Sequence, residues 1–388
     1  MKSPKNTTLL VLVLILLFSL PLFGFDFGLS VDSTTSVSLP LPAEAEEALG
    51  QRIKASLWTD HFWTTNNDAA LGIAAQGIYV YTLDRPYLFD LERLEFTYRI
   101  PEVFGGAAIA SGSAGRFFYS DPTGYILNHR IDGARFSLDF RGTEVRIGAG
   151  YTGLLLKEES GILYSDADFA DQNDTSKTLS PKRVFEGIDV IFTQLLPRQR
   201  LTLGVFSQQD LRGSEQEHSL YGHLGLTGPL ARGLFYSLTG ALGTDLESAN
   251  LGYLAQVTSS YFLPSFANSR FALGFLTTNE EFKPLSLASL GNLHNPGLSS
   301  ASRLQVSWAL RPWGNYYNPL IRNLGFEIDW KSFFDFAAAE KTDGNEVTAT
   351  VNFRPTSDLG VSFLGGMYIP SGGVDPEFLL QLLVSLGF

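Results

Sequence analysis

The residues of this chain that could carry chemistry are its charged side chains, because no catalytic or metal-binding motif is present. The histidines form neither HExxH nor another metal-ligand spacing; they are His61, His129, His218, His223 and His294. GxSxG, Walker A and dinucleotide-binding glycine patterns are also absent. We therefore expect no enzyme activity, no metal site and no cofactor.

Many charged residues alternate with apolar ones in short segments. In 135–141, Arg135 and Asp139 fall on one face, and Phe136 and Leu138 fall on the other. The segments 144–152, 303–311, 324–336 and 346–354 alternate in the same way. Their polar faces could line an aqueous channel and set its solute preference. The candidates are Arg99, Arg135, Asp139, Arg141, Arg146, Arg303, Glu327, Asp329, Lys331 and Arg354.

The elements that position these charges are extended strands. A period of two sends alternate side chains to opposite faces of a strand. Each segment therefore has one apolar face, yet the sequence supplies no amphipathic helices to cover such faces. Lipid is the simplest cover, which favours an all-β transmembrane antiparallel up-and-down barrel. A soluble two-layer sandwich or a solenoid is the alternative.

The composition agrees with a barrel of this kind. Hydrophobic residues make up 44% of the chain and aromatic residues 13%, but the mean hydropathy is only +0.05, as alternation predicts. Cysteine is absent, so no disulfide framework exists. The formal net charge of −12 argues against nucleic acid as a partner.

The N-terminus predicts export. Lys2 and Lys5 precede an apolar run, Leu9 to Leu22, whose length suits a signal peptide and is short for a membrane helix. We expect residues 1–24 to be a cleaved signal peptide and 25–388 to form a single barrel. A retained helical anchor is the alternative.

The C-terminal segment, 378–388, reads FLLQLLVSLGF. Counting back from Phe388 in steps of two gives one wholly apolar face. This ending resembles the last strand of bacterial outer-membrane β-barrels. The resemblance implies that Phe388 is an assembly signal read by the barrel-assembly machinery. It also implies an outer-membrane location in contact with lipid.

Short and long connections alternate along the chain, as periplasmic turns and external loops do in such barrels. We count about 18 strands, with 16 as the alternative if N-terminal strands merge. Residues 42–50 are expected to be a short helix or loop. The connection 311–322 is long for its side and fits the alternation least well. The short connections are rich in arginine, whereas the long ones carry acids.

The stretch 115–133 contains Asp-Pro-Thr-Gly, which predicts a turn between two strands. Gly115-Arg116 on the first strand and Asp132-Gly133 on the second resemble a pattern in alginate-export-type porins. The overall layout is also similar to uncharacterised barrels of spirochaete outer membranes. Neither resemblance implies a particular solute.

The longest connection, 156–183, is acidic and is a candidate constriction loop. Its acids are Glu158, Glu159, Asp166, Asp168, Asp171 and Asp174. Folded inward, they could approach Arg135 and Arg146 and narrow the channel. A solvated external loop is the alternative.

The sequence as a whole favours a porin, a water-filled barrel through which small hydrophilic solutes diffuse passively. A non-conducting surface barrel and a transporter of hydrophobic solutes are the alternatives. The solute, the ion selectivity and the oligomeric state stay open.

Overall fold

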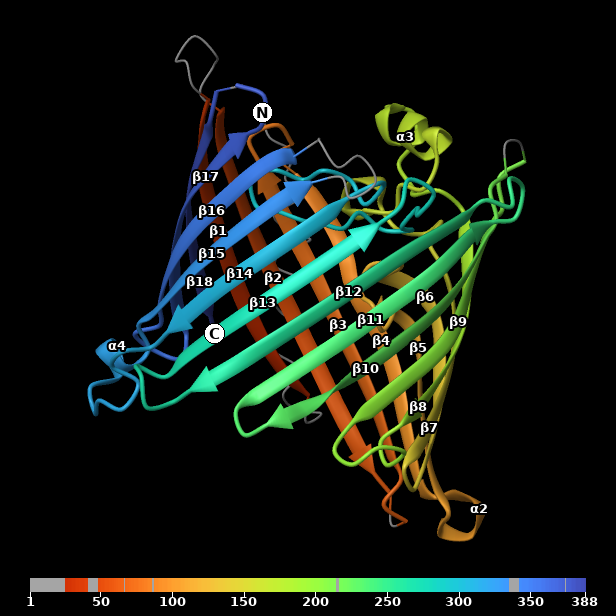
Figure 1. Ribbon diagram of the computed structural model, residues 1–388. Helices are drawn as coiled ribbons and strands as arrows, with labels where there is room; N and C mark the ends of the chain where they lie inside the picture. The colour runs from red at the N-terminus through yellow and green to blue at the C-terminus, as the bar shows by residue number, and fades with distance from the viewer. Residues whose placement is uncertain are drawn as a thin grey trace, which may run out of the picture.

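The chain forms one closed antiparallel β-barrel of 18 strands (Figure 1). A computed structural model describes residues 25–40, 48–65, 67–85, 87–213, 216–334, 342–373 and 375–388. Each strand pairs with its neighbours in the sequence, and the first also pairs with the last. The predicted 18-stranded barrel is therefore confirmed, and the alternative count of 16 is wrong.

The strands are long and the helices are short. No helix among the described residues is long and apolar enough to cross a membrane. The helical elements are α2 (Val103–Gly106), η2 (Lys157–Glu159), α3 (Asp166–Asn173) and α4 (Pro319–Arg322). The strands are β1 (Asp26–Pro40), β2 (Ala48–Thr64), β3 (Ala70–Thr82), β4 (Leu88–Glu102), β5 (Ala108–Ser120), β6 (Asn128–Phe140), β7 (Thr143–Tyr151), β8 (Arg183–Phe192), β9 (Arg200–Asp210), β10 (Ser219–Ala231), β11 (Leu234–Asp245), β12 (Leu251–Leu263), β13 (Ser269–Thr278), β14 (Ser302–Leu310), β15 (Gly325–Phe334), β16 (Thr342–Phe353), β17 (Leu359–Pro370) and β18 (Glu377–Gly387).

The last residue helps to close the barrel. The Phe388 N–H donates to the Leu29 carbonyl at 2.8 Å, and the Leu29 N–H donates to the Phe388 carbonyl at 3.1 Å. From there β18 pairs with β1 without a break from Gly387 opposite Ser30 to Glu377 opposite Pro40. Closure removes the open edges that a free sheet would present.

The outer face of the wall is an apolar band. Ile328 on β15 lies between Trp308 on β14 and Ala349 on β16, so these three side chains share a face. The next position, Asp329, lies between Ser307 and Thr348 on the opposite face. Among the described residues no element covers the apolar face, and Ile328 keeps 48% of its surface exposed. The polar face points into the barrel, which we call the lumen.

The connections divide the barrel into two ends. The long-loop end carries 83–87, 121–127, 152–182, 211–218 and 279–301, and α3 stands above it (Figure 1). The connection 246–250 and the described residues 371–373 also lie at the long-loop end. The other described turns lie at the short-turn end, with α2 and α4 at its rim. The connection 311–324 is long for this end, because it contains α4.

Some sequence expectations need correction or lie outside the described residues. Residues 48–50, expected in a helix or loop, are the start of β2. Residues 1–24 and 42–47 lie outside the described residues, as do Asp335 and Phe336, the end of the predicted segment 324–336.

The buried core lies inside the barrel at the long-loop end. Phe185, Phe206, Leu254 and Leu276 point inward from the wall and pack with Phe282, Leu285, Leu290 and Leu298 of the 279–301 loop. Because loops fill this end, the interior is not a uniform tube.

Substitutions at neighbouring positions of β12 test the two faces. Val257 pairs with Leu238 and Phe275 on the apolar face, and Thr258 pairs with Ser237 and Gly274 on the lumen face. In a lipid bilayer, Val257→Arg should lower the free energy of unfolding by about 2–4 kcal/mol, as arginine does near the midplane of a barrel wall. Thr258→Arg is the matched control and should cost much less. Equal losses in urea titrations of the two refolded variants would contradict the assignment of the faces.

Candidate functional site

A hairpin between β5 and β6 leaves the wall of the barrel. The pairing of β4 with β5 ends at Leu94 opposite Arg116, and that of β6 with β7 ends at Asp132 opposite Tyr151. Beyond these points β5 and β6 pair only with each other, up to Ser120 opposite Asn128. We call residues Arg116 to Asp132 the inward hairpin.

Two glycines permit the departure. Gly115 and Gly133 lie opposite each other at the base of the hairpin. A Cβ at Gly115 would lie 2.0 Å from the Leu94 carbonyl oxygen, and one at Gly133 would lie 2.1 Å from that of Ala149. Gly115 also has a φ of +121°, which side chains with a Cβ rarely adopt. Only glycine fits at this bend without movement of the backbone.

An ion pair fixes the base next to these glycines. The Arg116 guanidinium donates to both carboxylate oxygens of Asp132, at 2.8 Å and 2.9 Å. It also donates to the carbonyls of Leu91, at 3.0 Å, and Leu154, at 2.9 Å, and lies 3.3 Å from Asp90. The two-pronged geometry is the strong form of an arginine–carboxylate pair. Arg116 thus connects the hairpin to β4, although the pairing of β4 with the hairpin ends at Arg116.

The tip of the hairpin reaches the far wall. The Tyr125 hydroxyl accepts hydrogen bonds from Gln256 on β12, at 3.2 Å, and from Arg303 on β14, at 3.3 Å. The Ile126 carbonyl accepts from the Leu285 N–H at 2.8 Å. Because β12 and β14 are seven or more strands away from β5 around the barrel, the hairpin crosses the lumen.

The turn at the tip is held by one carboxylate. Asp121 accepts hydrogen bonds from the N–H groups of Thr123, Ile126 and Leu127, at 2.7–3.0 Å. Ile126 and Leu127 are fully buried against the core. The Asp-Pro-Thr-Gly turn was therefore predicted correctly as a turn, and the structure places it deep inside the barrel.

One face of the hairpin is apolar and packs on the wall. Phe117 and Ile131 are opposite each other and no more than 2% exposed, and Tyr119 lies 5.9 Å from the Phe206 ring. Phe206 in turn stacks on Phe185. Full burial of each large apolar side chain contributes about 1.5–3 kcal/mol. This packing holds the hairpin against β8 and β9.

The other face of the hairpin borders a polar cavity of about 450 Å³. Glu92 lines this cavity and is 5% exposed. Its carboxylate pairs with Arg130 of the hairpin and with Lys54 of β2, the latter at 2.6 Å, and accepts from Gln76 at 2.6 Å. A second carboxylate, Glu95, lies 2.6 Å from Arg93 and 2.9 Å from Arg135. Four cationic side chains thus face two carboxylates, which leaves the cavity net positive.

The acidic loop 152–182 closes over the long-loop end. Glu158 and Glu159 reach the β2–β3 side of the wall, where they lie 3.2 Å from Arg85 and 3.4 Å from Arg52. Farther along, Ser165 caps the N-terminus of α3: its hydroxyl accepts from the Asp168 N–H, and the Asp168 carboxylate accepts from the Ser165 N–H. Asp168 also lies 2.8 Å from the fully buried Arg183. Burial raises the pKa of the neighbouring Tyr164 hydroxyl to about 12. The loop is therefore a packed part of the barrel.

The second long loop, 279–301, is anchored by a single buried acid. The Glu346 carboxylate accepts hydrogen bonds from the N–H groups of Asn292, Leu293 and His294, at 2.9–3.2 Å. Lys331 compensates its charge at 2.9 Å. Replacement of Lys331 would leave the Glu346 carboxylate without a charged partner in the interior, whereas loss of Glu346 would leave Lys331 with Asp329 at 3.2 Å.

The predicted channel-lining residues are distributed unevenly. Arg99, Arg135, Asp139, Arg146, Arg303, Glu327, Asp329 and Lys331 lie on strands, on the face opposite the apolar band. Arg141 and Arg354 lie in turns instead, because β6 ends at Phe140 and β16 ends at Phe353.

The expected partners of the acidic loop are corrected by the structure. Arg135 pairs with Glu95, and Arg146 pairs with Glu144 of its own strand at 2.6 Å. Asp171 pairs with Lys177, Asp174 accepts from Ser176, and Asp166 lies in the first turn of α3. None of these loop acids is paired with Arg135 or Arg146 among the described residues.

Most residues of the cavity were not among the predicted channel-lining residues. Lys54, Glu92, Arg93 and Arg130 lie before or within the hairpin, where alternation was hard to read. One reason is a β-bulge in β4. Arg93 pairs with Gln76 and Leu91 pairs with Gly77, so Glu92 between them is an extra residue. A bulge shifts the alternation and re-aims side chains. The Gly-Arg and Asp-Gly pairs were the available signal for the bend.

Comparison with known proteins places the fold. No family model and no curated protein matches this sequence. Among solved structures, Pseudomonas aeruginosa OccK2 (OpdF) is similar with a TM-score of 0.66 and 14% identity, over 94% of this chain and 97% of that one. Acinetobacter baumannii OccAB4 gives 0.65 and 11%, over 94% and 98%. At these identities the likeness shows a shared fold. The resemblances to alginate-export-type porins and to spirochaete barrels stay expectations.

A methyl group at the base of the hairpin tests its geometry. Gly133→Ala would place a Cβ 2.1 Å from the Ala149 carbonyl oxygen. We expect a loss of about 1–3 kcal/mol in unfolding free energy, as overpacked sites show. Gly222→Ala is the matched control, because a Cβ at that position in β10 meets nothing within 4 Å. A loss at Gly222 as large as that at Gly133, in denaturant titrations, would count against the proposed bend.

Proposed function

We propose that this protein is an outer-membrane porin through which small hydrophilic solutes diffuse. The observation that carries the proposal is the inward hairpin, which crosses the lumen from Arg116 to the Tyr125 contacts on β12 and β14. A barrel of this strand number is too wide for its wall side chains to fill. The hairpin is held at its base and at its tip, so it occupies part of the lumen and leaves a narrower passage. In this orientation the long-loop end faces outside and the short-turn end faces the periplasm.

We further propose that the passage favours anions. The cavity beside the hairpin has Lys54, Arg93, Arg130 and Arg135 against Glu92 and Glu95. Fixed charges that line a pore set its ion preference. One similar structure, Pseudomonas aeruginosa OccK2 (OpdF), contains glucuronate, a sugar carboxylate. At 15% identity the likeness shows only the fold, so the charges of this chain carry the argument.

The acidic loop 152–182 is also part of the proposed passage. Glu158 and Glu159 pair with Arg85 and Arg52 on the β2–β3 side of the entrance. The loop 152–182 would then narrow the external mouth, with the hairpin forming the constriction below it. This differs from the expected role of the loop, because its acids act on Arg52 and Arg85 rather than on the lumen arginines.

Two proposals concern export. Residues 1–24 would be removed as a signal peptide, which N-terminal sequencing of the mature protein would establish. Phe388 would be read during assembly, consistent with its exposed ring and its place beside β1. The fraction of heat-modifiable folded protein, with and without Phe388, measures this role.

Reversal potentials in planar bilayers under a KCl gradient test the proposed function. We expect stepwise conductance with a preference for chloride. Arg135→Gln should lower the anion-to-cation permeability ratio about fourfold, because a unit positive charge about 10 Å away in water stabilises an anion and destabilises a cation by about 0.4 kcal/mol each. Arg135 is chosen because its loss leaves no carboxylate unpaired: Glu95 keeps Arg93 as a partner.

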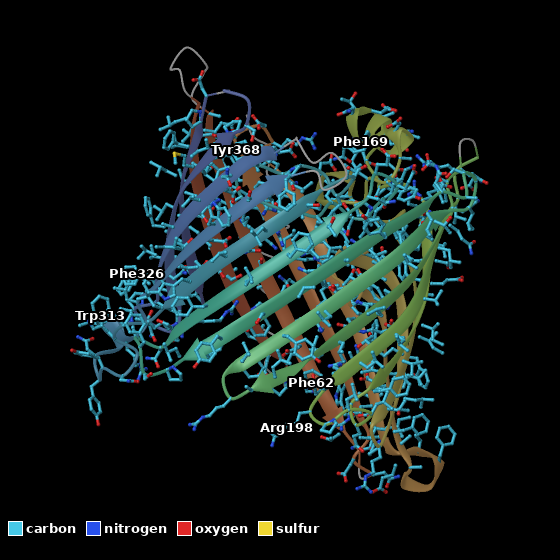
Figure 2. The ribbon with its side chains drawn as sticks, in the orientation of Figure 1. Phe62, Phe169, Arg198, Trp313, Phe326 and Tyr368 are labelled. Carbon is cyan, nitrogen blue, oxygen red and sulfur yellow. The ribbon has the colours of Figure 1, made fainter. Side chains whose placement is uncertain are left out.

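Arg198→Gln is the matched control. This arginine lies on a turn at the short-turn end, away from the cavity (Figure 2), and its loss should change the ratio less. A cation-selective parent protein would refute the anion preference. Folded protein that gives no conductance would favour a non-conducting surface barrel instead.

A further inference from the structure

The arginines at the short-turn end differ from the others in the chain. Arginines nearer the long-loop end are mostly paired, as Arg52, Arg85, Arg116 and Arg183 show. Within the described part of the chain, no ion pair involves those of the short-turn end: Arg141, Arg198, Arg200, Arg232, Arg270, Arg311, Arg322 and Arg354. The proposed constriction does not use this group.

Three of these arginines share one cavity. Arg270 at the start of β13, Arg311 just after β14 and Arg322 at the end of α4 line a space of about 610 Å³. We call these three residues the arginine cradle. Glu327 is the one carboxylate among the residues that line this cavity. The cradle therefore has an excess of positive charge without a partner from the described residues.

The cradle is built by three connections bonded to one another. The Arg311 N–H donates to the Ala267 carbonyl at 2.8 Å, and the Asn323 side-chain amide donates to the Arg354 carbonyl at 3.0 Å. Ala267 and Asn268 have φ values of +53° and +47°, which are uncommon for residues with a Cβ. Such backbone strain persists where the surroundings enforce it, often at binding sites.

The unusual length of 311–324 has a structural explanation in this cavity. The connection carries α4, and Trp313 packs against Phe326 at 6.1 Å, where Figure 2 shows both at the rim beside α4. This arrangement places Arg322 beside Arg311. A tight turn of two or three residues could not supply a third arginine to the same space.

The cradle opens on the lumen side of the wall. Arg270 pairs with Ala309, and Ala309 pairs with Glu327, so these positions share the face that carries Asp329. Arg311 lies across Gly325: a methyl group at Gly325 would be 3.7 Å from its Cγ. A solute that leaves the passage would therefore meet these guanidinium groups before it reaches the periplasm.

We propose that the arginine cradle binds an oxyanion, a carboxylate or a phosphate group, at the periplasmic mouth. Guanidinium forks match the paired oxygens of both groups. The cavity volume of about 610 Å³ lies within the range of small-molecule sites, about 300–1,000 Å³. The site itself stands on this cavity. Its use as an exit subsite for the transported anion rests on the proposed function.

Protection from phenylglyoxal, which modifies arginine side chains, tests the cradle in the folded protein. Modification is followed residue by residue with peptide mass spectrometry, with and without inorganic phosphate or glucuronate. We expect either anion to slow modification of Arg270, Arg311 and Arg322 at least threefold. Arg198 and Arg232, on separate short turns, are internal controls and should react at unchanged rates. Equal rates at all five arginines with and without anion would overturn the proposal.

Two further arms identify the source of the anion and separate this proposal from the channel function. Reconstitution in phosphatidylcholine with or without phosphatidylglycerol shows whether lipid alone protects the cradle, which would support an oxyanion site occupied by a lipid headgroup. Arg270→Gln should reduce the protection of Arg311, because one anion contacts both groups; unchanged protection would contradict a shared site. The readout does not depend on conductance, so a non-conducting barrel could still have the site.

Discussion

The interior of this barrel depends on the point where β5 and β6 leave the wall. A wall in lipid cannot leave backbone polar groups unpaired, so a departing hairpin needs substitutes for the lost ladder. Arg116 supplies one such substitute, because it donates to the Leu91 carbonyl of β4 while it pairs with Asp132. Gly115 and Gly133 remove the side chains that would block the bend. The tip can then reach Gln256 and Arg303 across the lumen.

This bend also determines where the charges lie. The apolar side of the hairpin packs against Phe185 and Phe206, which leaves its other side facing β2, β3 and β4. Arg130 is brought to Glu92 and Lys54, residues distant in the sequence. The loops 152–182 and 279–301 pack on the same core and complete the long-loop end. The three arginines of the cradle remain at the other end, so positive groups occur both beside the hairpin and at the short-turn end.

The sequence was sufficient for the barrel and insufficient for its interior. Alternation and the Phe388 ending predict antiparallel strands in a closed wall, because a period of two is a local property. The interior depends on contacts between distant residues, such as Tyr125 with Arg303 and Glu346 with the N–H groups of Asn292 and Leu293. Spacing carries no information on these contacts. The bulge at Glu92 also interrupted the alternation that would have placed Glu92 and Arg93 in the lumen.

The central claim is that the inward hairpin sets the narrowest passage, and single-channel conductance tests it most directly. A variant would keep Gly115-Arg116 and Asp132-Gly133 and replace 118–130 with a short Gly-Ser turn. The control would make the same kind of replacement in the rim loop 246–250, which lies outside the core cluster. The account predicts a higher conductance for the hairpin variant and parental conductance for the control. A folded hairpin variant with parental conductance would contradict it.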